Sequence, residues 1–404
     1  MRIGVVGLGY VGLVTAAVLA NKGNSVVGVD VDVSKIQMLT SGRSPIFEPE
    51  LDDRIRSAGN NLKFTTDYSE LSNCEAVFLC VPTPNEGDKI NLKYVMSAAE
   101  EVRKFSPSSD LVIKSTVLPG TARMVSQLTG MNVVSNPEFT REGTAISDTE
   151  KPDRIVIGGK FVKIVIKIWE FTRSPVIVTT NENAELIKYA SNAFLAVKIS
   201  FINQMADLCE KIPGTDINVV AEGMGMDRRI GREFLKAGIG YGGSCFPKDT
   251  VAISSFAFEN GIDLTIVNSA KRYNEDRVPH LVNKIEKSLG GLNGKKVCVL
   301  GLSFKDNTDD LRESGALLIV ENLKRLGAIV KAYDPVVGKI SNLELCNSPK
   351  ECISSSEIVI TATEWKCFSD IDPMILSGKK VFDLRRIFDP EKVELTMGVG
   401  LGEN

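Results

Sequence analysis

A glycine-rich turn at the start of the chain constrains its fold more than any other feature. The opening segment MRIGVVGLGYVGLVTAAVLANKGNSVVGVD predicts a strand over residues 2–6, an apolar helix over residues 11–20 and a second strand that ends at Asp30. The turn between the first strand and the helix follows the pattern GxGxxG, with glycines at positions 7, 9 and 12. This context, with an acidic residue after the second strand, predicts a dinucleotide-binding Rossmann unit.

Each residue of this turn meets a separate physical requirement. Gly7 permits the tight turn, Gly9 lets the backbone approach a pyrophosphate, and Gly12 lets the helix pack on the strand. The N–H groups and the dipole at the start of the helix favour an anion. Asp30 would accept hydrogen bonds from a ribose 2′-OH and repel a 2′-phosphate, so we expect NAD rather than NADP. The alternative is a packing turn followed by a surface aspartate.

Three further strands follow, and the loop after each carries polar side chains. The segments are EAVFLCVPTP (75–84), DLVIKSTVLPGT (110–121) and NVVSNPEFTREG (132–143). The carboxyl ends of parallel strands line the ligand crevice of an open α/β sheet. We therefore expect one cleft to receive the side chains of Thr83, Thr116, Glu138 and Glu142.

A long helical pattern separates this half from a second copy of the opening pattern. Residues from about 181 to 221 place apolar side chains at helical spacing, which is typical of a connector or a dimer interface. Residues 295–335 then repeat strand, glycine turn, helix and strand, with Asp334 at the end of the second strand. This repeat lacks the GxGxxG glycines and carries SFKDNTDDLRES instead, so it is either a structural lid or a nucleotide-binding half that serves another ligand.

The predicted fold class is therefore α/β, with two Rossmann-like doubly wound domains joined by a long central helix. We predict a dinucleotide-binding domain over residues 1–180, a central helical connector and dimerisation domain over 181–285, and a second Rossmann-like domain over 286–404. Two such domains form a ligand cleft between them.

Composition excludes several other classes of protein. The chain has 404 residues and a net charge of −3, so no basic field for nucleic acid is predicted. The sequence contains no run of eighteen or more apolar residues, so we expect no membrane span. We recognise no leader segment either. The eight cysteines form no CxxC pair and no zinc-ligand spacing, which indicates no metal site, reduced thiols and a cytoplasmic protein. The single histidine, His280, leaves lysine, acidic residues and cysteine as the other candidates for catalysis.

Two positions on the long helix could bind an oxyanion. Lys188 and Asn192 are four residues apart and share one face of the helix. Such a pair is usually a solvated edge, but the apolar flanks at Leu186, Ile187 and Phe194 favour partial burial. An ammonium and an amide aimed at one oxygen would stabilise an alkoxide or a tetrahedral intermediate.

A cysteine lies in the glycine-rich segment GYGGSCFPKD at residues 240–249. The glycines permit positive φ and a close approach of the backbone. Lys248 and a helix start near Pro247 would favour the thiolate of Cys245, and Asp249 could orient a neighbour or hold a proton. The alternative is a small residue in a turn. With NAD, a thiolate could trap an aldehyde as a thiohemiacetal, which a second oxidation turns into a hydrolysable thioester without a histidine.

These motifs occur together in a known order. The chain contains GLGYVGLV, SPIFEPEL, VPTP, KSTVLPGT, NPEFTREG, ELIKYASNAFLA, GYGGSCFPKD and FKDNTDDLRES. In this respect it strongly resembles the UDP-glucose/GDP-mannose dehydrogenase family over nearly its whole length. The resemblance implies oxidation of the primary alcohol of a UDP-sugar to a carboxylate with two NAD⁺. It also implies a UDP-sugar-binding C-terminal domain and a homodimer through the central helix.

The resemblance also implies roles for individual residues. Cys245 would be the covalent nucleophile, Lys188 and Asn192 would stabilise the substrate oxygens, and Asp249 would act beside them. Glu138 would serve thioester hydrolysis with a water on Thr116. The predicted cofactor contacts are Gly7, Gly9, Tyr10, Val11, Gly12, Asp30, Lys35, Thr83, Thr116, Glu142 and Arg312. The predicted substrate contacts are Phe139, Thr140, Arg141, Glu142, Lys188, Asn192, Tyr241, Gly242, Lys305, Arg385 and, from the partner subunit, Arg229.

The resemblance leaves the substrate and the class of protein open to alternatives. UDP-glucose is the expected substrate, and GDP-mannose or another nucleotide sugar is the alternative. Relatives that act on N-acetylated sugars usually carry a histidine before the cysteine, so Ser244 argues against them. A different class, a non-catalytic dinucleotide-binding scaffold, is disfavoured because Lys188, Asn192, Cys245 and Asp249 are all present.

Overall fold

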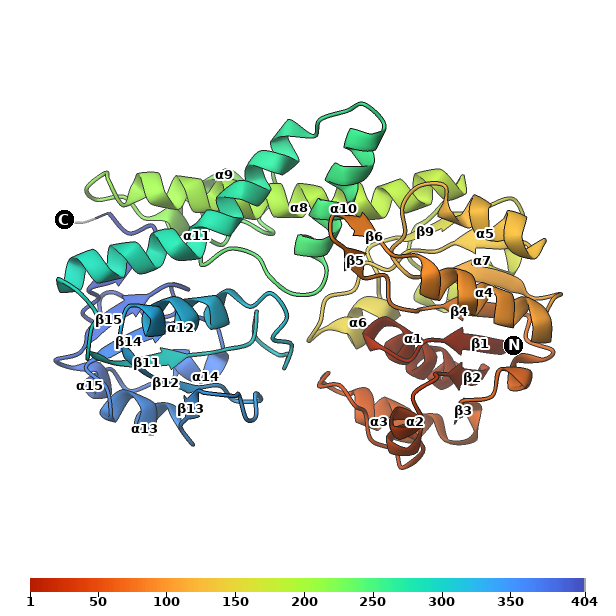
Figure 1. Cartoon of the computed structure of the whole chain (residues 1–404), viewed down its shortest axis with the longest axis horizontal. Helices are drawn as coiled ribbons and strands as arrows, with labels where there is room; N and C mark the ends of the chain where they lie inside the picture. Colours follow the sequence, from red (N-terminus) through yellow and green to blue (C-terminus); the bar gives the residue numbers. More distant parts are fainter. Residues whose placement is uncertain (403–404) are drawn as a thin grey trace. The chain divides into compact units, whose positions relative to one another are not determined.

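The computed structural model describes residues 1–402, which fall into two compact units. Unit 1 contains residues 1–191 together with 251–261, and unit 2 contains residues 192–250 together with the chain from 262 onward. Each unit contains a sheet with helices on its faces (Figure 1). The division into three domains over residues 1–180, 181–285 and 286–404 remains a prediction.

The sheet of unit 1 has eight strands in the order β10-β9-β8-β7-β4-β1-β2-β3. Neighbouring strands are parallel, except that β8 and β9 are antiparallel. The direction in which strands are added reverses between β1 and β4, which creates the switch point where ligands of doubly wound sheets bind. The strands are β1 (Arg2–Val6), β2 (Ser25–Val29), β3 (Leu62–Thr65), β4 (Ala76–Leu79), β7 (Asp110–Ile113), β8 (Val133–Ser135), β9 (Ile155–Gly158) and β10 (Val176–Thr179).

Helices cover both faces of this sheet and bury it in two apolar cores. Helix α1 is apolar on all sides and is buried from Gly12 to Ala20, as a helix between a sheet and its neighbours requires. The hairpin of β5 (Asn85–Glu86) and β6 (Lys89–Ile90) lies outside the main sheet. The helices are α1 (Tyr10–Asn21), α2 (Val33–Thr40), α3 (Leu51–Ala58), α4 (Lys93–Phe105), α5 (Thr121–Thr129), α6 (Ala145–Glu150) and α7 (Lys163–Trp169).

The predicted long helix is present as α8, which spans 29 residues from Asn181 to Cys209. The helical pattern that the sequence continued to residue 221 is interrupted after Cys209, because Pro213 and Gly214 break the helix before α9 (Ile217–Gly225). Two more helices follow, α10 (Phe246–Glu259) and α11 (Thr265–Leu289).

The sheet of unit 2 has six parallel strands in the order β13-β12-β11-β14-β15-β16. Its direction of addition reverses between β11 and β14, so the second doubly wound unit that the repeat predicted is confirmed. The strands are β11 (Lys296–Leu300), β12 (Ile329–Tyr333), β13 (Glu344–Leu345), β14 (Ile358–Thr361), β15 (Lys380–Asp383) and β16 (Met397–Gly398). The helices are α12 (Gly315–Arg325), α13 (Pro349–Ser354), α14 (Lys366–Ser369) and α15 (Pro373–Leu376).

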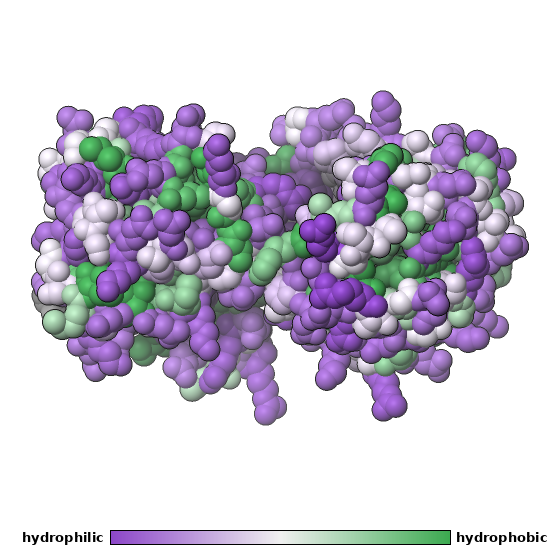
Figure 2. Space-filling model, turned by 90° about the horizontal axis from the view of Figure 1, so that it is seen from below, coloured by the Kyte–Doolittle hydropathy of each residue, from purple (hydrophilic) through white to green (hydrophobic). Residues whose placement is uncertain are grey.

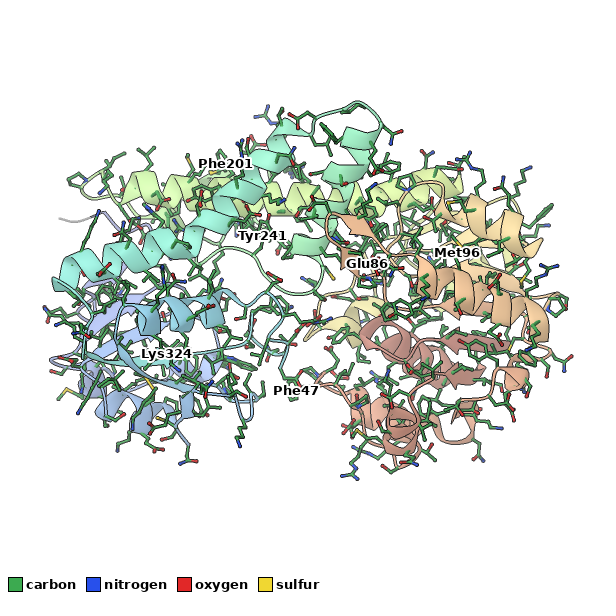
Figure 3. All side chains as sticks on the ribbon, viewed as in Figure 1. Phe47, Glu86, Met96, Phe201, Tyr241 and Lys324 are labelled. Atoms are coloured by element: carbon green, nitrogen blue, oxygen red, sulfur yellow. A yellow bond between two sulfur atoms is a disulfide. The ribbon has the colours of Figure 1, made fainter. Side chains whose placement is uncertain are left out.

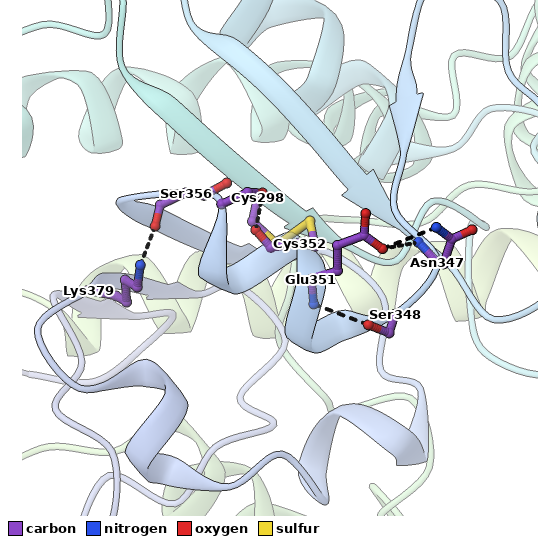
Figure 4. Close-up of a disulfide and its surroundings, with 8 residues drawn as sticks. Cys298, Asn347, Ser348, Glu351, Cys352, Ser356 and Lys379 are labelled. Atoms are coloured by element: carbon purple, nitrogen blue, oxygen red, sulfur yellow. Dashed lines mark hydrogen bonds between the residues drawn. A yellow bond between two sulfur atoms is a disulfide. The ribbon is translucent and has the colours of Figure 1, made fainter.

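One cysteine pair differs from the expectation of reduced thiols. Cys298 of β11 and Cys352 of α13 form a disulfide, with their Cα atoms 5.5 Å apart (Figure 4). The two residues are 54 positions apart in the sequence, and only the packing of α13 on β11 brings them together. Spacing arguments based on short cysteine motifs therefore could not detect the pair.

The surface of the protein carries both hydrophilic and apolar side chains. Figure 2 shows hydrophilic side chains over most of the face that it presents, with scattered apolar patches. Within residues 1–402, no helix is long and apolar enough to cross a bilayer. The cytoplasmic location stays a prediction.

Candidate active site

The three glycines of the first turn have three different surroundings. Gly7 has φ +88°, which side chains with a Cβ rarely adopt. A Cβ on Gly12 would lie 1.9 Å from the carbonyl oxygen of Gly7, so α1 can approach the turn only because this position is glycine. A Cβ on Gly9 would meet no atom within 4 Å. The backbone at Gly9 is therefore open to a ligand at the start of α1.

Asp30 follows β2 and is almost completely buried. Its Oδ2 accepts the N–H of Leu8 in the glycine turn at 2.7 Å and the ammonium of Lys35 at 2.7 Å. Its Oδ1 accepts the N–H of Asp32 at 3.0 Å. Because a carboxylate offers about four acceptor sites, Oδ1 keeps capacity for a ribose hydroxyl.

The second Rossmann-like unit repeats the hydrogen bond from the glycine turn to the aspartate, but here protein groups also occupy the remaining acceptor positions of that aspartate. Gly301 has φ +91°, and the N–H of Leu302 donates to Oδ2 of Asp334 at 2.8 Å, as Leu8 does to Asp30. Asp334 also accepts the N–H of Ser303 and the indole N–H of Trp365, at 3.1 and 3.2 Å. Two backbone N–H groups just after β12 donate to its Oδ1. This carboxylate is therefore saturated by protein, which fits the missing glycine fingerprint.

The exits of β4 and β7 meet beside the switch point of unit 1. The hydroxyl of Thr83 donates to the carbonyl of Thr116 at 3.0 Å, and the hydroxyl of Ser115 donates to the carbonyl of Val81 at 2.7 Å. Of the expected cleft residues, Thr83 and Thr116 are therefore in direct contact.

Glu138 and Lys188 form a buried ion pair. The ammonium of Lys188 donates to Oε1 of Glu138 at 2.9 Å, and both side chains are almost inaccessible. Oε2 accepts the N–H and the hydroxyl of Thr140, at 2.6 and 2.8 Å. Burial alone would raise the pKa of Glu138, but Lys188 and Thr140 outweigh it and hold that pKa below its usual value. Removal of either charge would deprive its buried partner of its counter-charge, at a cost of about 3–5 kcal/mol.

The segment after Glu138 is held by side chains on three sides. The guanidinium of Arg154 stacks on the ring of Phe139, with its Cζ 3.7 Å from the ring centre. Arg141 pairs with Asp148 of α6 through its Nε at 3.0 Å and its Nη2 at 2.8 Å. The N–H of Gly143, which follows Glu142, is accepted by Glu48 at 2.6 Å and by the hydroxyl of Tyr10 at 2.9 Å. The predicted substrate segment is thus fixed in place within unit 1.

Asn192 and the GYGGSCFPKD segment meet within unit 2. The amide of Asn192 donates to Oδ2 of Asp249 at 2.7 Å, and Lys248 donates to Oδ1 at 2.6 Å. Asp249 is 1% exposed. Cys245 directly precedes α10, and its carbonyl accepts the N–H of Asp249 at 2.8 Å. The thiol is exposed, as a nucleophile requires, and the expected position at a helix start is confirmed.

The glycines before Cys245 pack against protein. A Cβ on Gly242 would lie 2.1 Å from the carbonyl oxygen of Glu313, and a Cβ on Gly243 would lie 2.8 Å from the ring of Phe304. Both contacts are with the SFKDNTDDLRES segment, whose Arg312 carbonyl also accepts the N–H of Gly243. These glycines therefore dock the cysteine loop on the exit of β11.

Tyr241 is held in the same loop, which precedes α10 (Figure 3). Its backbone exchanges two hydrogen bonds with the side chain of Asn274, at 2.8 and 3.0 Å. Its ring packs edge-on against Phe246, and burial raises the pKa of Tyr241 to about 12. Tyr241 is therefore a neutral, packed side chain at ordinary pH.

Three cations and two carboxylates gather at the exits of β11, β14 and β15, namely Lys236, Lys305 and Arg385 with Asp306 and the half-buried Glu364. Arg385 lies 3.2 Å from Glu364 through its Nε and also donates to the carbonyls of Ala362 and Phe304. Burial would raise the pKa of Glu364, but Arg385, Lys236 and Lys305 outweigh it and hold that pKa below its usual value. The site thus carries excess positive charge at the switch point of the second sheet.

The two remaining predicted arginines are exposed and paired locally. Arg229 is 89% exposed and makes a bidentate contact with Asp227. Arg312 makes the same kind of contact with Asp310. Their contacts with a partner subunit and a cofactor stay predictions.

Comparison with known proteins assigns the chain to a family. The NAD-binding, central and UDP-binding domains of the UDP-glucose/GDP-mannose dehydrogenase family match residues 1–170, 182–276 and 298–390. The chain belongs to this family. It is 41% identical to UDP-glucose 6-dehydrogenase YwqF of Bacillus subtilis, over 95% of this chain and 94% of that protein. It is 40% identical to UDP-glucose 6-dehydrogenase of Rhizobium meliloti, over 97% of both chains.

Its structure is also similar to a solved member of the family. A UDP-glucose dehydrogenase from Pyrobaculum islandicum superposes with a TM-score of 0.93 at 37% identity, over 99% of this chain and 98% of that one. The cofactor is NAD, in agreement with the sequence prediction. The open backbone at Gly9 and the acceptor capacity of Asp30 fit such a dinucleotide.

Sequence reasoning missed several buried charged residues in the segments that carry the candidate site. Each lies in or beside a motif that was already quoted: Glu48 in SPIFEPEL, Lys114 in KSTVLPGT and Glu185 in ELIKYASNAFLA. Lys114 lies with its ammonium 4.7 Å from the ring centre of Trp169, and burial lowers its pKa. The sequence signal was their membership in a motif, but their contacts depend on the fold.

Proposed function

We propose that this protein is a UDP-glucose 6-dehydrogenase that oxidises UDP-glucose to UDP-glucuronate with two NAD⁺. The observation that carries the proposal is the exposed Cys245 at the start of α10, in the same unit as the buried Asn192–Asp249 pair, and the buried Lys188–Glu138 pair of unit 1 supports it. The full-length similarity to UDP-glucose 6-dehydrogenases supports UDP-glucose over other nucleotide sugars. GDP-mannose and other nucleotide sugars are the alternative substrates.

The positive cluster of unit 2 supports binding of a diphosphate. Lys236, Lys305 and Arg385 bring three positive charges against the two carboxylates of Glu364 and Asp306. They lie at the switch point of a parallel sheet, where doubly wound folds bind nucleotides. Arg385 also fixes Phe304, next to Lys305, through its carbonyl. We propose that Lys305 and Arg385 contact the substrate here.

The first oxidation converts the C6 alcohol to an aldehyde. Lys188 and Asn192 lie one turn apart on α8 and would donate to the C6 oxygen as its proton leaves. NAD⁺, when bound, supplies the acceptor for a hydride from C6. The thiolate of Cys245 then adds to the aldehyde carbon, and the same two donors stabilise the oxyanion of the thiohemiacetal.

The second oxidation and hydrolysis complete the reaction. Loss of a second hydride from the thiohemiacetal gives a thioester on Cys245. Water held by Thr116 attacks this thioester, with Glu138 or Asp249 accepting a proton, and the thiolate leaves as the carboxylate forms. One alcohol, one water and two NAD⁺ thus give one carboxylate, two NADH and three protons. The ionised state that Lys188 imposes on Glu138 suits a proton acceptor.

A homodimer through α8 is part of this proposal. Phe194, Phe201 and Leu208 are spaced seven residues apart on α8 and are 64%, 43% and 52% exposed. A repeat of seven keeps an apolar stripe on one side of a helix, as in paired helices. Phe201 is the second of the three in sequence and is labelled in Figure 3. We propose that Arg229 then contacts the substrate of the neighbouring subunit.

A panel of nucleotide sugars tests the function. The purified protein is incubated with UDP-glucose, GDP-mannose or UDP-N-acetylated sugars, each with NAD or NADP, and the yield of NADH or NADPH per sugar is measured. We expect turnover with UDP-glucose and NAD, with two NADH per sugar. Turnover with GDP-mannose alone would reassign the substrate. NAD binding without turnover of any sugar would favour a scaffold.

Replacement of the nucleophile tests the mechanism. Cys245→Ser should abolish UDP-glucuronate formation, because an alkoxide leaving group at this position is far poorer than a thiolate. An adduct trapped on the introduced hydroxyl would be visible by intact-protein mass. Exposed Cys367→Ser is the matched control and should keep full activity. UDP-glucuronate formation at the native rate in the Cys245 variant would exclude the nucleophile assignment.

A further inference from the structure

Glu185 lies on α8 three residues before Lys188, and its carboxylate joins two segments of unit 1. Oε2 accepts the N–H of Gly120 at 2.7 Å, and Oε1 accepts the N–H of Ala122 at 2.8 Å. Oε1 also accepts the hydroxyl of Ser135, the last residue of β8, at 3.2 Å. The residue is 3% exposed. A buried carboxylate therefore ties α8 to the start of α5 and to the end of β8.

The same face of α8 carries two further contacts with β8 and its exit. Asn181, Glu185 and Lys188 occupy positions i, i+4 and i+7, which share one face. The side chain of Asn181 accepts the N–H of Ser135 at 2.9 Å. Lys188 donates to Glu138 in the β8 exit at 2.9 Å. One helix face thus determines where the exits of β7 and β8 lie.

A small cavity marks the point where these groups converge. It has a volume of about 10 Å³, near the lower limit for one water. Its polar lining includes Thr116, Ser135, Glu185 and Lys188. A shift of the Glu185 side chain would therefore change the positions of both Lys188 and the segment that carries Thr116.

We propose that Glu185 is a positioning residue for the oxidation, because its carboxylate fixes the Thr116 segment relative to Lys188. This inference rests on the proposed dehydrogenase function. The ionised carboxylate can accept all three hydrogen bonds. The protonated acid cannot, since its O–H is itself a donor that faces other donors.

The protonation of Glu185 changes within the neutral range. Burial raises the pKa of Glu185 to about 7, although the donors at Ala122, Gly120 and Ser135 oppose this rise. The positioning bonds are therefore complete above this pKa and incomplete below it. The charged groups on the surrounding elements are Glu182 and Lys188 of α8, Arg123 of α5, Lys114 after β7 and Glu138 after β8.

A charge-removing variant of the same shape tests the inference. We compare Glu185→Gln with wild type for kcat and for KM of UDP-glucose and NAD, between about pH 5.5 and about pH 8.5. At the alkaline end kcat should fall about tenfold to a hundredfold, as expected for a displaced catalytic group, with little change in KM for NAD. At the acid end the ratio of variant to wild type should approach one, because protonated Glu185 resembles glutamine.

The control is Glu182→Gln on the same helix, where the side chain is half-buried and pairs with Arg123. It should keep the wild-type kcat at alkaline pH, and its fall in kcat at acid pH should shift to slightly lower pH, because the charge of Glu182 helps to raise the pKa of Glu185. A ratio for Glu185→Gln that is constant over the whole pH range would indicate a merely structural role and would overturn the inference. An unchanged kcat at alkaline pH would overturn it as well.

Hydrogen–deuterium exchange tests the positioning bonds without any substrate. In Glu185→Gln, the amides of Gly120 and Ala122 should exchange faster at alkaline pH, while those of β1 and β2 should keep their protection. Unchanged exchange at Gly120 and Ala122 would refute the inference. If wild type turns over no sugar nucleotide, the proposed function fails, and the exchange result still decides whether Glu185 holds this segment.

Discussion

At the scale of single residues, the two aspartates that follow the second strand of each Rossmann unit explain why the units differ. Asp30 and Asp334 make the same bond to the turn after the first strand. Asp334 is then saturated by Ser303, Trp365 and the backbone after β12, whereas Asp30 keeps capacity beside Lys35. The two units therefore differ in the groups that surround a shared aspartate, and this difference leaves acceptor capacity for a dinucleotide only at Asp30.

Asp30 should determine the choice between NAD and NADP. In Asp30→Ala, the ratio of kcat/KM for NAD to that for NADP should fall by about tenfold or more, because the carboxylate no longer repels a 2′-phosphate and like-charge contacts cost several kcal/mol. Lys35 would then lack its carboxylate partner and would favour the phosphate. The measurement is steady-state kinetics with both cofactors.

The matched control for this change is Asp32→Ala. Asp32 is close in sequence, but its carboxylate caps α2 through the N–H groups of Ser34 and Lys35 and lies in solvent. Its loss should reduce stability slightly and leave the cofactor ratio unchanged. An unchanged ratio in Asp30→Ala would remove Asp30 from cofactor selection.

The sequence predicted individual residues well where one residue type has a unique physical use. Positive φ at Gly7 and close packing at Gly12 follow from the fingerprint alone. The partner of a buried charge is different, because it depends on elements far apart in the chain. Glu185 meets Gly120 across 65 positions, and Lys188 meets Glu138 across 50. No local pattern encodes such a pair.

At the scale of secondary-structure elements, periodicity and turn signals predicted the strands that carry the site but not every helix end. The strands β1, β4, β7 and β8 lie within the predicted segments. The long helix was extended too far, since Pro213 and Gly214 interrupt an otherwise continuous pattern. The packing of α13 on β11 could not be predicted either, and this packing places Cys298 beside Cys352.

The disulfide between these elements should stabilise unit 2. Its loop of 54 residues corresponds to a loss of unfolded-state entropy worth about 4 kcal/mol in the chain-entropy model. Reduction should therefore lower the melting temperature of the wild-type protein in differential scanning calorimetry. Cys352→Ala should start from the lower value and should not respond to reductant.

A buried cysteine in the same core provides the control. Cys346 packs in the cluster that contains Cys298 and Cys352 but is unpaired within the described residues. Cys346→Ala should therefore keep the response to reductant. Alkylation of the unfolded chain before reduction should label six thiols, and alkylation after reduction should label eight. Eight labels before reduction would show that the bond is absent.

At the scale of the whole molecule, the proposed homodimer determines whether one chain can complete its own site. Arg229 is exposed and stands on a short segment after α9. The apolar stripe of α8 offers a surface on which a second copy can pack by two-fold symmetry. If Arg229 contacts the substrate of the neighbouring subunit, Cys245 and Arg229 of one chain serve two different active sites of the dimer.

Heterodimers should separate contributions made within one subunit from those made across the interface. Cys245→Ser and Arg229→Ala are each expected to be nearly inactive as homodimers. A heterodimer of the two, purified through different tags, combines both defects in one site and leaves the other intact. It should therefore recover about half of wild-type kcat per dimer, since one of two symmetric sites works. A heterodimer of Cys245→Ser with Lys188→Ala has one defect in each site and should stay inactive, which controls for exchange of subunits. No recovery in the first heterodimer would show that Arg229 serves its own subunit.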